Sequence, residues 1–493
     1  MKYFTKNNII IFILLVATYF SVFFQINSYP IQLWDEGTYA VNAYEMCLNG
    51  DLLVKHYNDK PEMWATNPPL VCYFQAICIK IFGPSELAVR FPSALAALGV
   101  VLLIIRFSNK EKLGLDFTAY AVLALISSKG YVAYHVTRTG DLDSVLIFFV
   151  TGSIIYFYKF IEYEEKKVKY LIIFSLFILL GYYAKGIACF MVLPAFLIYS
   201  ILKNKVLYVL KTKQLYFCIL SVFMLIATYY LLREQRNPGY IKATFTSEVG
   251  RYYTAGDDWS TKPFYYYVQQ MFEGEFQYIL FIPAIIILFC FLPKTNNYRN
   301  KSIIWLTTSI TYLLVISLSK NKTPWYDAPL YPMLSIYLAL GLKSIINFKV
   351  LHSFKSSYIA KGVFCFGLYA LPYSHVLKHN FEGEMPWHDT QFGEALKRYN
   401  EINNVPKKME MLTAGYNGPA LFYKHVYNNK YGYNITIRDI AGQANINMKL
   451  GTTYIFTHPA VREYMDKNFN VELYMCSDGM LVAKPISYKL KPK

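Results

Sequence analysis

Long apolar segments without charged residues recur along the first three-quarters of the chain. Residues 9–26 contain no charged side chain over about the length that an α-helix needs to cross a bilayer. Comparable runs follow as far as about residue 376, whereas residues 379–493 alternate polar and apolar positions in short stretches. This pattern predicts a mainly α-helical, polytopic membrane domain at 1–378, followed by a small α/β domain at 379–493 outside the membrane.

The C-terminal stretch has the element pattern of a small α/β domain. A helix is predicted near 390–402, followed by strand-like segments at 410–416, 433–440, 453–458 and 471–476. It contains no recognisable catalytic motif. We expect such a domain either to bind an acceptor substrate or to shape a cavity of the membrane domain.

Clusters of basic residues between the apolar runs give the predicted orientation, because short cytoplasmic loops are enriched in lysine and arginine. The clusters comprise Lys2, Lys6, Arg106, Lys110, Lys112, Lys166, Lys167, Lys169, Lys203, Lys205, Lys211, Lys213, Lys294, Arg299, Lys301, Lys343, Lys349 and Lys355. All of them face the cytoplasm only if the segment at 69–82, which is short for a span, lies flat on the outer surface. The result is about 11 spans, an odd number that places the C-terminal domain outside.

Composition and charge narrow the class of protein further. The chain of 493 residues is 55% hydrophobic and only 16% charged, which is too apolar for an ordinary soluble protein. The formal charge of +17 does not indicate nucleic acid, because many basic residues lie in the predicted cytoplasmic loops and no base-reading helix is apparent. The eight cysteines fit neither a disulfide framework nor a zinc site. His135, His375 and His388 show no metal-ligand spacing, so the sequence requires no cofactor. A divalent metal that assists at a phosphate stays an open alternative.

Acidic pairs stand at two predicted outer boundaries of the membrane domain. Asp35 and Glu36 follow the first span in WDEGTYA, and a carboxylate held at low dielectric can act as a general base. The alternative is a solvated loop pair. Asp141 and Asp143 lie in RTGDLDSVL close to Arg138, where the alternative is capping of the next helix. Asp143 is nearer the apolar run, so we expect it to point into the bundle.

Cations and a tyrosine form a second group on the predicted outer face. Lys185 in YYAKGIA lies outside against the charge rule, which makes it a candidate phosphate ligand; the alternative, a lysine that snorkels to the membrane interface, stays open. Lys320, Lys322 and Tyr326 lie in the proline-rich stretch SKNKTPWYDAPLYP, where lysines can bind a phosphate and a tyrosine can donate a hydrogen bond to it. Arg251 is a further candidate in a long aromatic loop, most of whose tyrosines we interpret as membrane-interface anchors.

Seven stretches resemble a known family in their order and spacing. They are WDEGTYA (34–40), PPL (68–70), GPSELAVRFPSAL (83–95), RTGDLDSVLIFF (138–149), AKG (184–186), KPFYYY (262–267) and SKNKTPWYDAPLYP (319–332). Together they resemble the type C membrane glycosyltransferases, in the branch that contains protein O-mannosyltransferases and the lipid A aminoarabinose transferase. The resemblance covers most of residues 1–345 and does not extend into the C-terminal domain.

The resemblance implies roles for individual residues. It implies Asp35 as the catalytic base and Glu36 as its support. The acid of the RTG-x-x-D pattern corresponds to Asp143, and the lysine and tyrosine of the K-x-P-x-Y pattern correspond to Lys322 and Tyr326.

One departure from the family pattern concerns the carrier phosphate. Family members often have lysine or histidine just before PPL, where this chain has Asn67. An uncharged amide cannot form an ion pair with a phosphate. Lys60, Lys185, Arg251 or Lys322 are therefore the candidate phosphate ligands.

These residues lead to the expectation of an inverting glycosyltransferase in the cytoplasmic (inner) membrane. It would move a sugar from a polyprenyl-phosphate donor to an acceptor hydroxyl of a lipid, protein or glycan on the outer face, where the C-terminal domain also lies. One alternative is a flippase or transporter for a lipid-linked sugar, which would favour polar residues at the midplane and inverted repeats. Another is a polysaccharide ligase or polymerase that uses a lipid-diphosphate donor.

Overall fold

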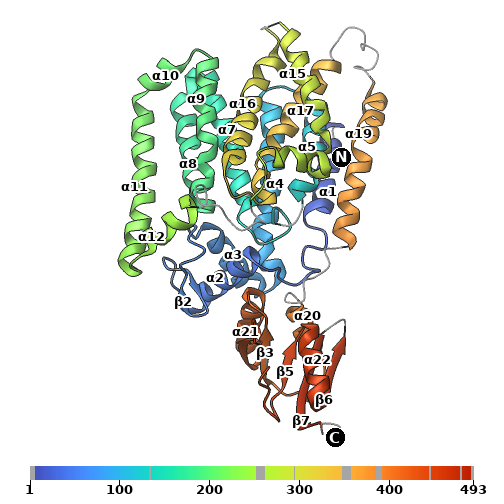
Figure 1. The fold of residues 1–493 in the computed structure, drawn as a ribbon. Coiled ribbons are helices and arrows are strands. Elements are labelled where there is room, and N and C mark those ends of the chain that lie inside the picture. The colour runs from blue at the N-terminus through green and yellow to red at the C-terminus, as the bar shows by residue number, and fades with distance from the viewer. Residues whose placement is uncertain are drawn as a thin grey trace, which may run out of the picture. The chain divides into compact units, whose positions relative to one another are not determined.

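Helices make up most of the chain in the computed structural model, which describes residues 6–132, 135–250, 261–293, 295–346, 357–382, 391–443, 446–477 and 480–489. The chain divides into two compact units (Figure 1). The larger unit comprises Met1–Gln25, Met63–Val71 and Pro92–Glu382. The smaller unit comprises Ile26–Glu62, Cys72–Phe91 and Gly383–Lys493. The α/β part thus groups with two segments that the sequence analysis had assigned to the membrane domain.

The larger unit is a bundle of apolar helices. Within the described residues, five helical stretches are long and apolar enough to cross a membrane: Glu86–Lys110, Asp143–Glu162, Glu164–Leu202, Lys213–Arg236 and Asn297–Leu318. A sixth is reached if Tyr266–Glu275 and Gln277–Phe291, which meet at 111°, form one broken span. The predicted total of about 11 spans stays a prediction.

Several shorter or less apolar helices complete this unit. They are α1 (Lys6–Val22), α5 (Leu115–Ile126), α6 (Lys129–Val132), α10 (Val206–Lys211), α12 (Tyr240–Thr244), α14 (Tyr266–Gln270), α15 (Phe281–Phe291), α17 (Leu330–Ile346) and α19 (Tyr358–Glu382). The long helices are α4 (Glu86–Lys110), of which only Pro92–Lys110 belongs to this unit, α7 (Asp143–Glu162), α11 (Lys213–Arg236) and α16 (Asn297–Leu318). Of the long ones, α7 is the most enclosed: 94% of its apolar window is buried, so it forms the centre of the bundle.

The stretch Glu164–Leu202 contains two antiparallel runs. As a single helix its 39 residues would extend for about 58 Å, nearly twice the hydrocarbon thickness of a bilayer. Instead the rings of Phe174 and Phe196 lie 5.2 Å apart, which requires the chain to reverse midway between them. Helix α8 (Lys167–Lys185) ends there, and the 3₁₀ turn η2 (Gly186–Val192) leads back into α9 (Leu193–Leu202). The AKG stretch (184–186) thus lies at the turn between two apolar helices.

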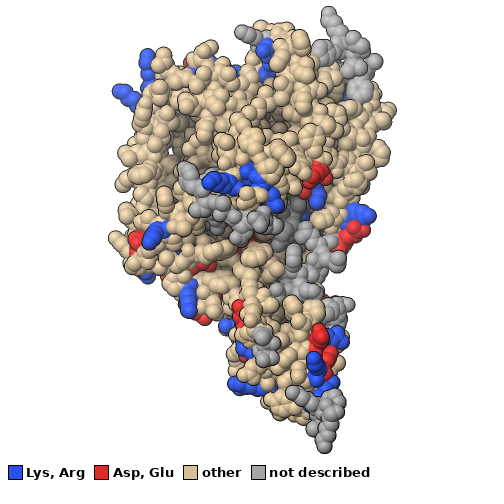
Figure 2. Space-filling model, viewed as in Figure 1, with Lys and Arg blue, Asp and Glu red and all other residues tan. Residues whose placement is uncertain are grey.

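Helix α11 presents an apolar surface to the outside. Its charged residues stand only near its two ends. Phe217, Phe223 and Leu231 along its length are 72%, 63% and 60% exposed. Figure 2 shows the corresponding surface without lysine, arginine, aspartate or glutamate between the charges at the two ends. An exposed apolar surface of this length is expected where a helix faces lipid.

The smaller unit is built on a five-stranded mixed sheet with strand order β4-β3-β5-β7-β6. Its strands are β3 (Lys408–Thr413), β4 (Asn434–Asp439), β5 (Tyr454–Phe456), β6 (Phe469–Ser477) and β7 (Met480–Tyr488). Strand β3 pairs in parallel with β4 and β5, whereas β7 pairs antiparallel with β5 and β6. Its helices include α20 (Phe392–Asn400), α21 (Gly418–Tyr431) and α22 (Pro459–Asn468). The helix predicted near 390–402 and the four predicted strands are confirmed; α21, α22 and β7 were not predicted.

Two glycines allow helix α2 (Asp35–Asn49) to pack closely against α21 within this unit. A Cβ added at Gly37 would lie 2.8 Å from Cδ of Pro419, and one added at Gly418 would lie 3.0 Å from the carbonyl carbon of Gly37. Any side chain at either position would push the helices apart. The glycine of WDEGTYA is therefore required by contact with the C-terminal part of the chain.

The smaller unit also contains a short hairpin and most of helix α3. The hairpin pairs β1 (His56–Tyr57) with β2 (Lys60–Pro61), and α3 spans Leu70–Phe82. At 13 residues α3 is about 20 Å long, shorter than the hydrocarbon core of a bilayer. Its length agrees with the expectation that this segment does not cross; its orientation in the membrane stays a prediction.

Candidate active site

Glu36 is fully buried and forms a two-pronged ion pair with Arg90. The Arg90 Nε–Glu36 Oε1 distance is 2.6 Å, and a second guanidinium nitrogen donates to Oε2 at 2.9 Å. The other N–H groups donate at 2.8 Å to the carbonyls of Ile26, Tyr29 and Pro30. The arginine therefore fastens the segment that precedes α2 to the first turn of that helix, with its planar donor fork fully used.

Asp35 is the first residue of α2 and is partly exposed, in contrast to the buried Glu36. The residue before it, Trp34, has φ 63° and ψ −120°, a conformation that costs a non-glycine residue energy. The ring of Tyr416 stacks on Trp34 at 5.0 Å, and its hydroxyl bonds to the Trp34 carbonyl and to Thr38. These contacts hold the backbone at Asp35 in one conformation.

The hydroxyl of Tyr416 is a neutral donor beside this carboxylate. Burial raises the pKa of Tyr416 well above its ordinary value, and the nearby carboxylate of Asp35 adds to that shift. A phenol that stays protonated donates hydrogen bonds without competing for the proton that a carboxylate base accepts. The acidic pair thus consists of one enclosed, charge-paired residue and one accessible residue.

In the larger unit, three of the predicted site residues lie together. Nζ of Lys185, at the end of α8, lies 2.5 and 2.6 Å from the two oxygens of Asp143, the first residue of α7. The same nitrogen lies 5.4 Å from the ring centre of Tyr326. The RTG-x-x-D, AKG and K-x-P-x-Y stretches therefore meet, although about 40 and 140 residues separate Lys185 from its two partners along the chain.

Asp141 is buried next to His135. Nδ1 of His135 lies 3.3 Å from Asp141 Oδ1, and the hydroxyl of Thr139 donates to Oδ2. Burial opposes ionisation, but His135 and Thr139 stabilise the carboxylate and hold the pKa of Asp141 below its ordinary value. The N-cap residue of α7 is Leu142, not Asp141. The carboxylate of Asp141 therefore contacts His135 and Thr139 and does not cap α7, contrary to the alternative interpretation.

The histidine is fixed on its other face by an aromatic ring. Trp325 of the proline-rich loop stacks on His135 with ring centres 3.7 Å apart. The pair of His135 and Asp141 offers an imidazole nitrogen and a carboxylate oxygen, two groups that divalent metals accept as ligands. The sequence spacing of the histidines gave no indication of this pair.

Asn67, the residue before PPL, contacts a protein carboxylate. Its Nδ2 donates to Glu248 Oε1 at 2.6 Å, and Glu248 Oε2 accepts the backbone N–H of Ile187 at 3.2 Å. Glu248 thereby lies against Gly186, the residue that directly follows Lys185. Where the family pattern has a cation, this chain has an amide that positions an acid at the α8 turn.

Replacing Gly186 by alanine is expected to lower both stability and activity. Gly186 has φ 57° and ψ −138°, and an added Cβ would lie 2.6 Å from Glu248 Oε2. We expect a loss of about 1–3 kcal/mol of folding free energy from backbone strain, with displacement of Glu248 and Lys185 in addition. The measurements are the melting temperature in detergent and the rate of sugar transfer.

Gly274→Ala is the matched control, because Gly274 has φ 121° and no atom within 4 Å of an added Cβ. Alanine at this position introduces backbone strain but contacts no neighbouring side chain, unlike alanine at Gly186. Equal losses of transfer in the two variants would contradict a role for the Gly186–Glu248 contact.

The proline-rich loop is fastened by Lys322. This side chain is only 4% exposed, and its ammonium donates to the carbonyls of Ser319 at 2.5 Å and Lys262 at 3.1 Å. Burial lowers the pKa of Lys322. Two of its three donors are thus used inside the protein, whereas the neighbouring Lys320 is exposed.

Three other predicted ligands have different surroundings. Arg138 donates to the carbonyls of Ser21, Val22 and Phe24 at the C-terminal end of α1, at 3.2, 3.3 and 2.9 Å. These bonds give Arg138 a structural part at that helix end. Lys60 is exposed on the two-residue strand β2. Arg251 lies outside the described residues.

Five residues that the sequence analysis did not single out contribute to these clusters: Arg90, Trp325, Glu248, Thr139 and Tyr416. Of these, Arg90 had a usable signal, since an arginine within an apolar helix marks a buried partner. Asp35 and Glu36 belong to the smaller unit, and Asp143, Lys185 and Tyr326 to the larger.

Comparison with known proteins agrees with these motifs. Residues 66–231 match the family described as dolichyl-phosphate-mannose-protein mannosyltransferase. The chain is 26% identical over 335 residues to an uncharacterized protein of Aquifex aeolicus, an alignment that covers 67% of this chain and 64% of that one. It is 24% identical over 341 residues to undecaprenyl phosphate-alpha-4-amino-4-deoxy-L-arabinose arabinosyl transferase of Aeromonas hydrophila, covering 67% of this chain and 60% of the relative. The chain thus spans about three-fifths of the length of the curated relatives that it matches.

A solved structure shares the fold over nearly the whole length. The crystal structure of ArnT from Cupriavidus metallidurans bound to undecaprenyl phosphate superposes with a TM-score of 0.71 over 97% of both chains, at 14% identity. An identity this low establishes the common fold only. Together with the ordered motifs, the matched segment and the sequence relatives, this common fold supports a type C membrane glycosyltransferase similar to the protein mannosyltransferases and the aminoarabinose transferases.

Proposed function

We propose that the chain moves a sugar from a polyprenyl-phosphate donor to an acceptor hydroxyl on the outer face of the cytoplasmic membrane, with inversion at the anomeric carbon. The observation that carries this proposal is the contact of Lys185 with Asp143 and Tyr326, which joins three of the family's stretches at the ends of two apolar helices. A cation at a helix end, at a predicted membrane boundary, suits a phosphate whose lipid tail remains in the bilayer. The relatives support this donor class, since one is named for transfer from undecaprenyl phosphate.

The proposed reaction is a single displacement. Asp35 accepts the proton of the acceptor hydroxyl as its oxygen forms a bond to the anomeric carbon. The bond between that carbon and the phosphate oxygen breaks at the same time, and the bonding electrons leave with the phosphate. Lys185 stabilises the charge that develops on the leaving phosphate, and Lys322 retains one donor for the same purpose.

Two residues have positioning roles in this scheme. Asp143 orients the ammonium of Lys185 through both carboxylate oxygens, and Glu36 orients the start of α2 through Arg90. Neither needs to contact the sugar. The accessible Asp35, next to the enclosed Glu36, is the member of the pair that an acceptor can approach.

The positions of the charged groups favour an enzyme over a flippase. Asp143 and Lys185 stand at helix ends, whereas a transporter that alternates access keeps its site near the midplane between repeats. A polysaccharide ligase or polymerase would share the membrane fold but would take a lipid diphosphate. The type of lipid donor, monophosphate or diphosphate, therefore distinguishes the proposed glycosyltransferase from a polysaccharide ligase or polymerase.

Purified chain in lipid nanodiscs, given a labelled polyprenyl-monophosphate sugar and a panel of lipid, peptide and glycan acceptors, is expected to transfer label to one acceptor class. Parallel reactions contain the corresponding polyprenyl-diphosphate sugar. Transfer from the polyprenyl-diphosphate sugar but not from the monophosphate would contradict the proposal and indicate a polysaccharide ligase or polymerase. Movement of intact donor across vesicles without transfer would replace it with the flippase.

A further inference from the structure

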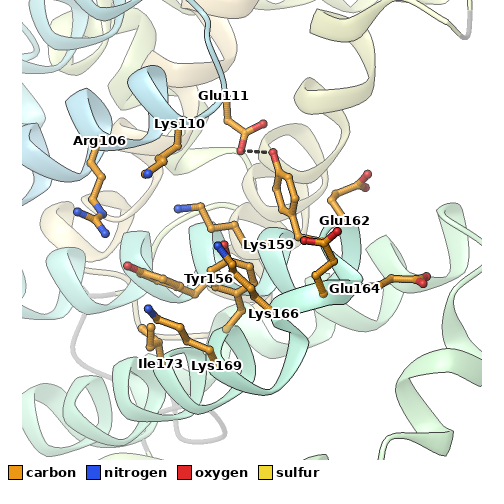
Figure 3. A pocket seen from close by; sticks show the side chains of 13 residues that line it. Arg106, Lys110, Glu111, Tyr156, Lys159, Glu162, Glu164, Lys166, Lys169 and Ile173 are labelled. Carbon is orange, nitrogen blue, oxygen red and sulfur yellow. Dashed lines mark hydrogen bonds between the residues drawn. The ribbon is translucent and has the colours of Figure 1, made fainter.

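A polar cavity lies in the larger unit at the end of α7 that is remote from Asp143 (Figure 3). Its volume is about 510 Å³. It is lined by α4, by α7, by α8 and by the short turn η1 (Glu164–Lys166) that joins α7 to α8. Five cations line it, namely Arg106, Lys110, Lys159, Lys166 and Lys169. The mechanism proposed above uses none of these residues.

Lys159 is the central feature of this cavity. Its side chain is only 5% exposed, and its ammonium lies 5.0 and 5.9 Å from the ring centres of Tyr156 and Tyr170. In the part of the chain that the structure describes, this ammonium forms no hydrogen bond and no ion pair, and Glu111, the carboxylate that acts on its charge from a longer distance, is itself paired with Lys301 at 2.9 Å. A buried charge is costly without a counter-charge, so the cavity is suited to an anion that supplies one.

The other four cations share this lack of partners. Arg106, Lys110, Lys166 and Lys169 form no ion pair or hydrogen bond through their side chains within the described ranges. In Figure 3 the labelled cations gather on one side of the cavity, and Glu162 and Glu164 lie on the other. Five positive groups held this close repel one another, which an anion between them would relieve.

The carboxylates in the lining only partly offset these cations. Three of them are each bound by a lysine from outside the cavity: Glu111 by Lys301 at 2.9 Å, Glu162 by Lys203 at 2.8 Å and Glu164 by Lys205 at 2.8 Å. Glu165 alone remains against the five cations. The lining therefore has an excess of positive charge that the protein itself does not balance.

The cavity is separate from the candidate active site. Lys159 lies 16 residues beyond Asp143 on the same helix, which corresponds to about 24 Å along the axis. That distance approaches the hydrocarbon thickness of a bilayer. In the proposed topology the candidate active site lies at the outer boundary and this cavity at the cytoplasmic one.

Apolar side chains next to the cavity can accommodate a lipid tail. On α8, Ile172, Leu176 and Leu180 are 48%, 49% and 37% exposed, and they follow one another at helical spacing beside the residues that line the cavity. On α4, Leu102 is 48% exposed one turn before Arg106. A free anion would not contact this apolar surface, whereas a lipid phosphate would place its headgroup in the basic cavity and its tail along the apolar side chains.

We propose that this cavity binds a lipid-borne phosphate at the membrane boundary opposite the candidate active site. The phosphate lies between Lys159 and the four partnerless cations, and the hydroxyls of Tyr156 and Tyr170 are available as donors, whereas that of Tyr163 already donates to Glu111. The tail follows the apolar stripe of α8. Basic cavities between membrane helices on the cytoplasmic side are suited to anionic headgroups. The lipid is an anionic phospholipid or a polyprenyl phosphate, which present the same phosphate chemistry.

Native mass spectrometry of the full-length protein in detergent tests this assignment. The probes are phosphatidylglycerol, polyprenyl phosphate, inorganic phosphate and, as a neutral lipid, phosphatidylcholine. Lys166→Ala/Lys169→Ala is expected to weaken retention of the anionic lipid about thirtyfold, since each basic residue near an anionic lipid contributes about 1 kcal/mol. The matched control is Lys167→Ala/Lys211→Ala, which removes two charges from the same predicted face without touching the cavity lining.

The outcomes separate the sources of the phosphate. A selective loss of phosphatidylglycerol or of polyprenyl phosphate in the cavity variant supports the proposal and identifies the lipid. Displacement of either lipid by inorganic phosphate at equal concentration would overturn the lipid assignment. Equal retention by the cavity and control variants, both with unchanged melting temperatures, would overturn the site.

Discussion

Replacing Asp35 by asparagine is expected to lower sugar transfer by about 10²–10⁴-fold, the usual cost of removing a general base. The amide has nearly the shape of the carboxylate but cannot accept the proton of the acceptor hydroxyl. Since Asp35 is partly exposed and the contacts that hold α2 run through Glu36, Arg90 and Tyr416, the variant should fold as the parent does. The measurement is the initial rate with saturating labelled donor, together with the melting temperature.

Asp59→Asn is the matched control for this prediction. Asp59 lies in the same unit at the turn of the β1–β2 hairpin, and its substitution removes one exposed carboxylate without touching the start of α2. Near-normal transfer by Asp35→Asn would remove Asp35 from the mechanism. An equal loss in Asp59→Asn would show that the effect arises from net charge and not from the base.

Replacing Arg90 by methionine is expected to cost about 3–5 kcal/mol of folding free energy. The substitution leaves the fully buried Glu36 without its counter-charge and releases three backbone carbonyls from their donor. Because these bonds connect the segment before α2 to the first turn of that helix, transfer should fall as well. Thermal unfolding in detergent and the transfer rate give the two readouts.

The partner substitution tests whether the unpaired charge causes the loss. Arg90→Met/Glu36→Gln removes both charges and is expected to recover part of the stability. Arg462→Met, which breaks an exposed pair with Asp466 in the same unit, should cost at most about 1 kcal/mol. If Arg90→Met cost no more than Arg462→Met, the buried pair would not be what holds α2.

Some helices and strands could be predicted from local sequence pattern, and others could not. The apolar runs on either side of 184–186 were visible because lipid-facing and buried helices both exclude charge over a fixed length. The strands of the C-terminal sheet were visible through alternation of apolar and polar residues. Helices α21 and α22 were missed because the aromatic and polar residues of α21 and the short length of α22 give little helical periodicity.

The candidate site was predicted in its residues but not in their partners. Asp143, Lys185 and Tyr326 were named from the sequence, and the fold brings them together. The structure adds a second role for Lys322, since two of its three donors go to the carbonyls of Ser319 and Lys262, and its role as a phosphate ligand stays a prediction. A lysine in a loop carries no local signal that distinguishes a ligand from a residue that fastens the loop.

The sequence by itself determined the apolar segments, the family motifs and the α/β character of the tail, because each depends on side chains within one short stretch of chain. Tertiary structure alone decided that Glu36 is enclosed by Arg90, that Asn67 meets Glu248 and that α2 packs on α21 through Gly37 and Gly418. The physical reason is that the strength of a buried charge pair or a close backbone contact depends on distance and on exclusion of water. Both are properties of segments far apart in the chain, and they exist only once the chain has folded.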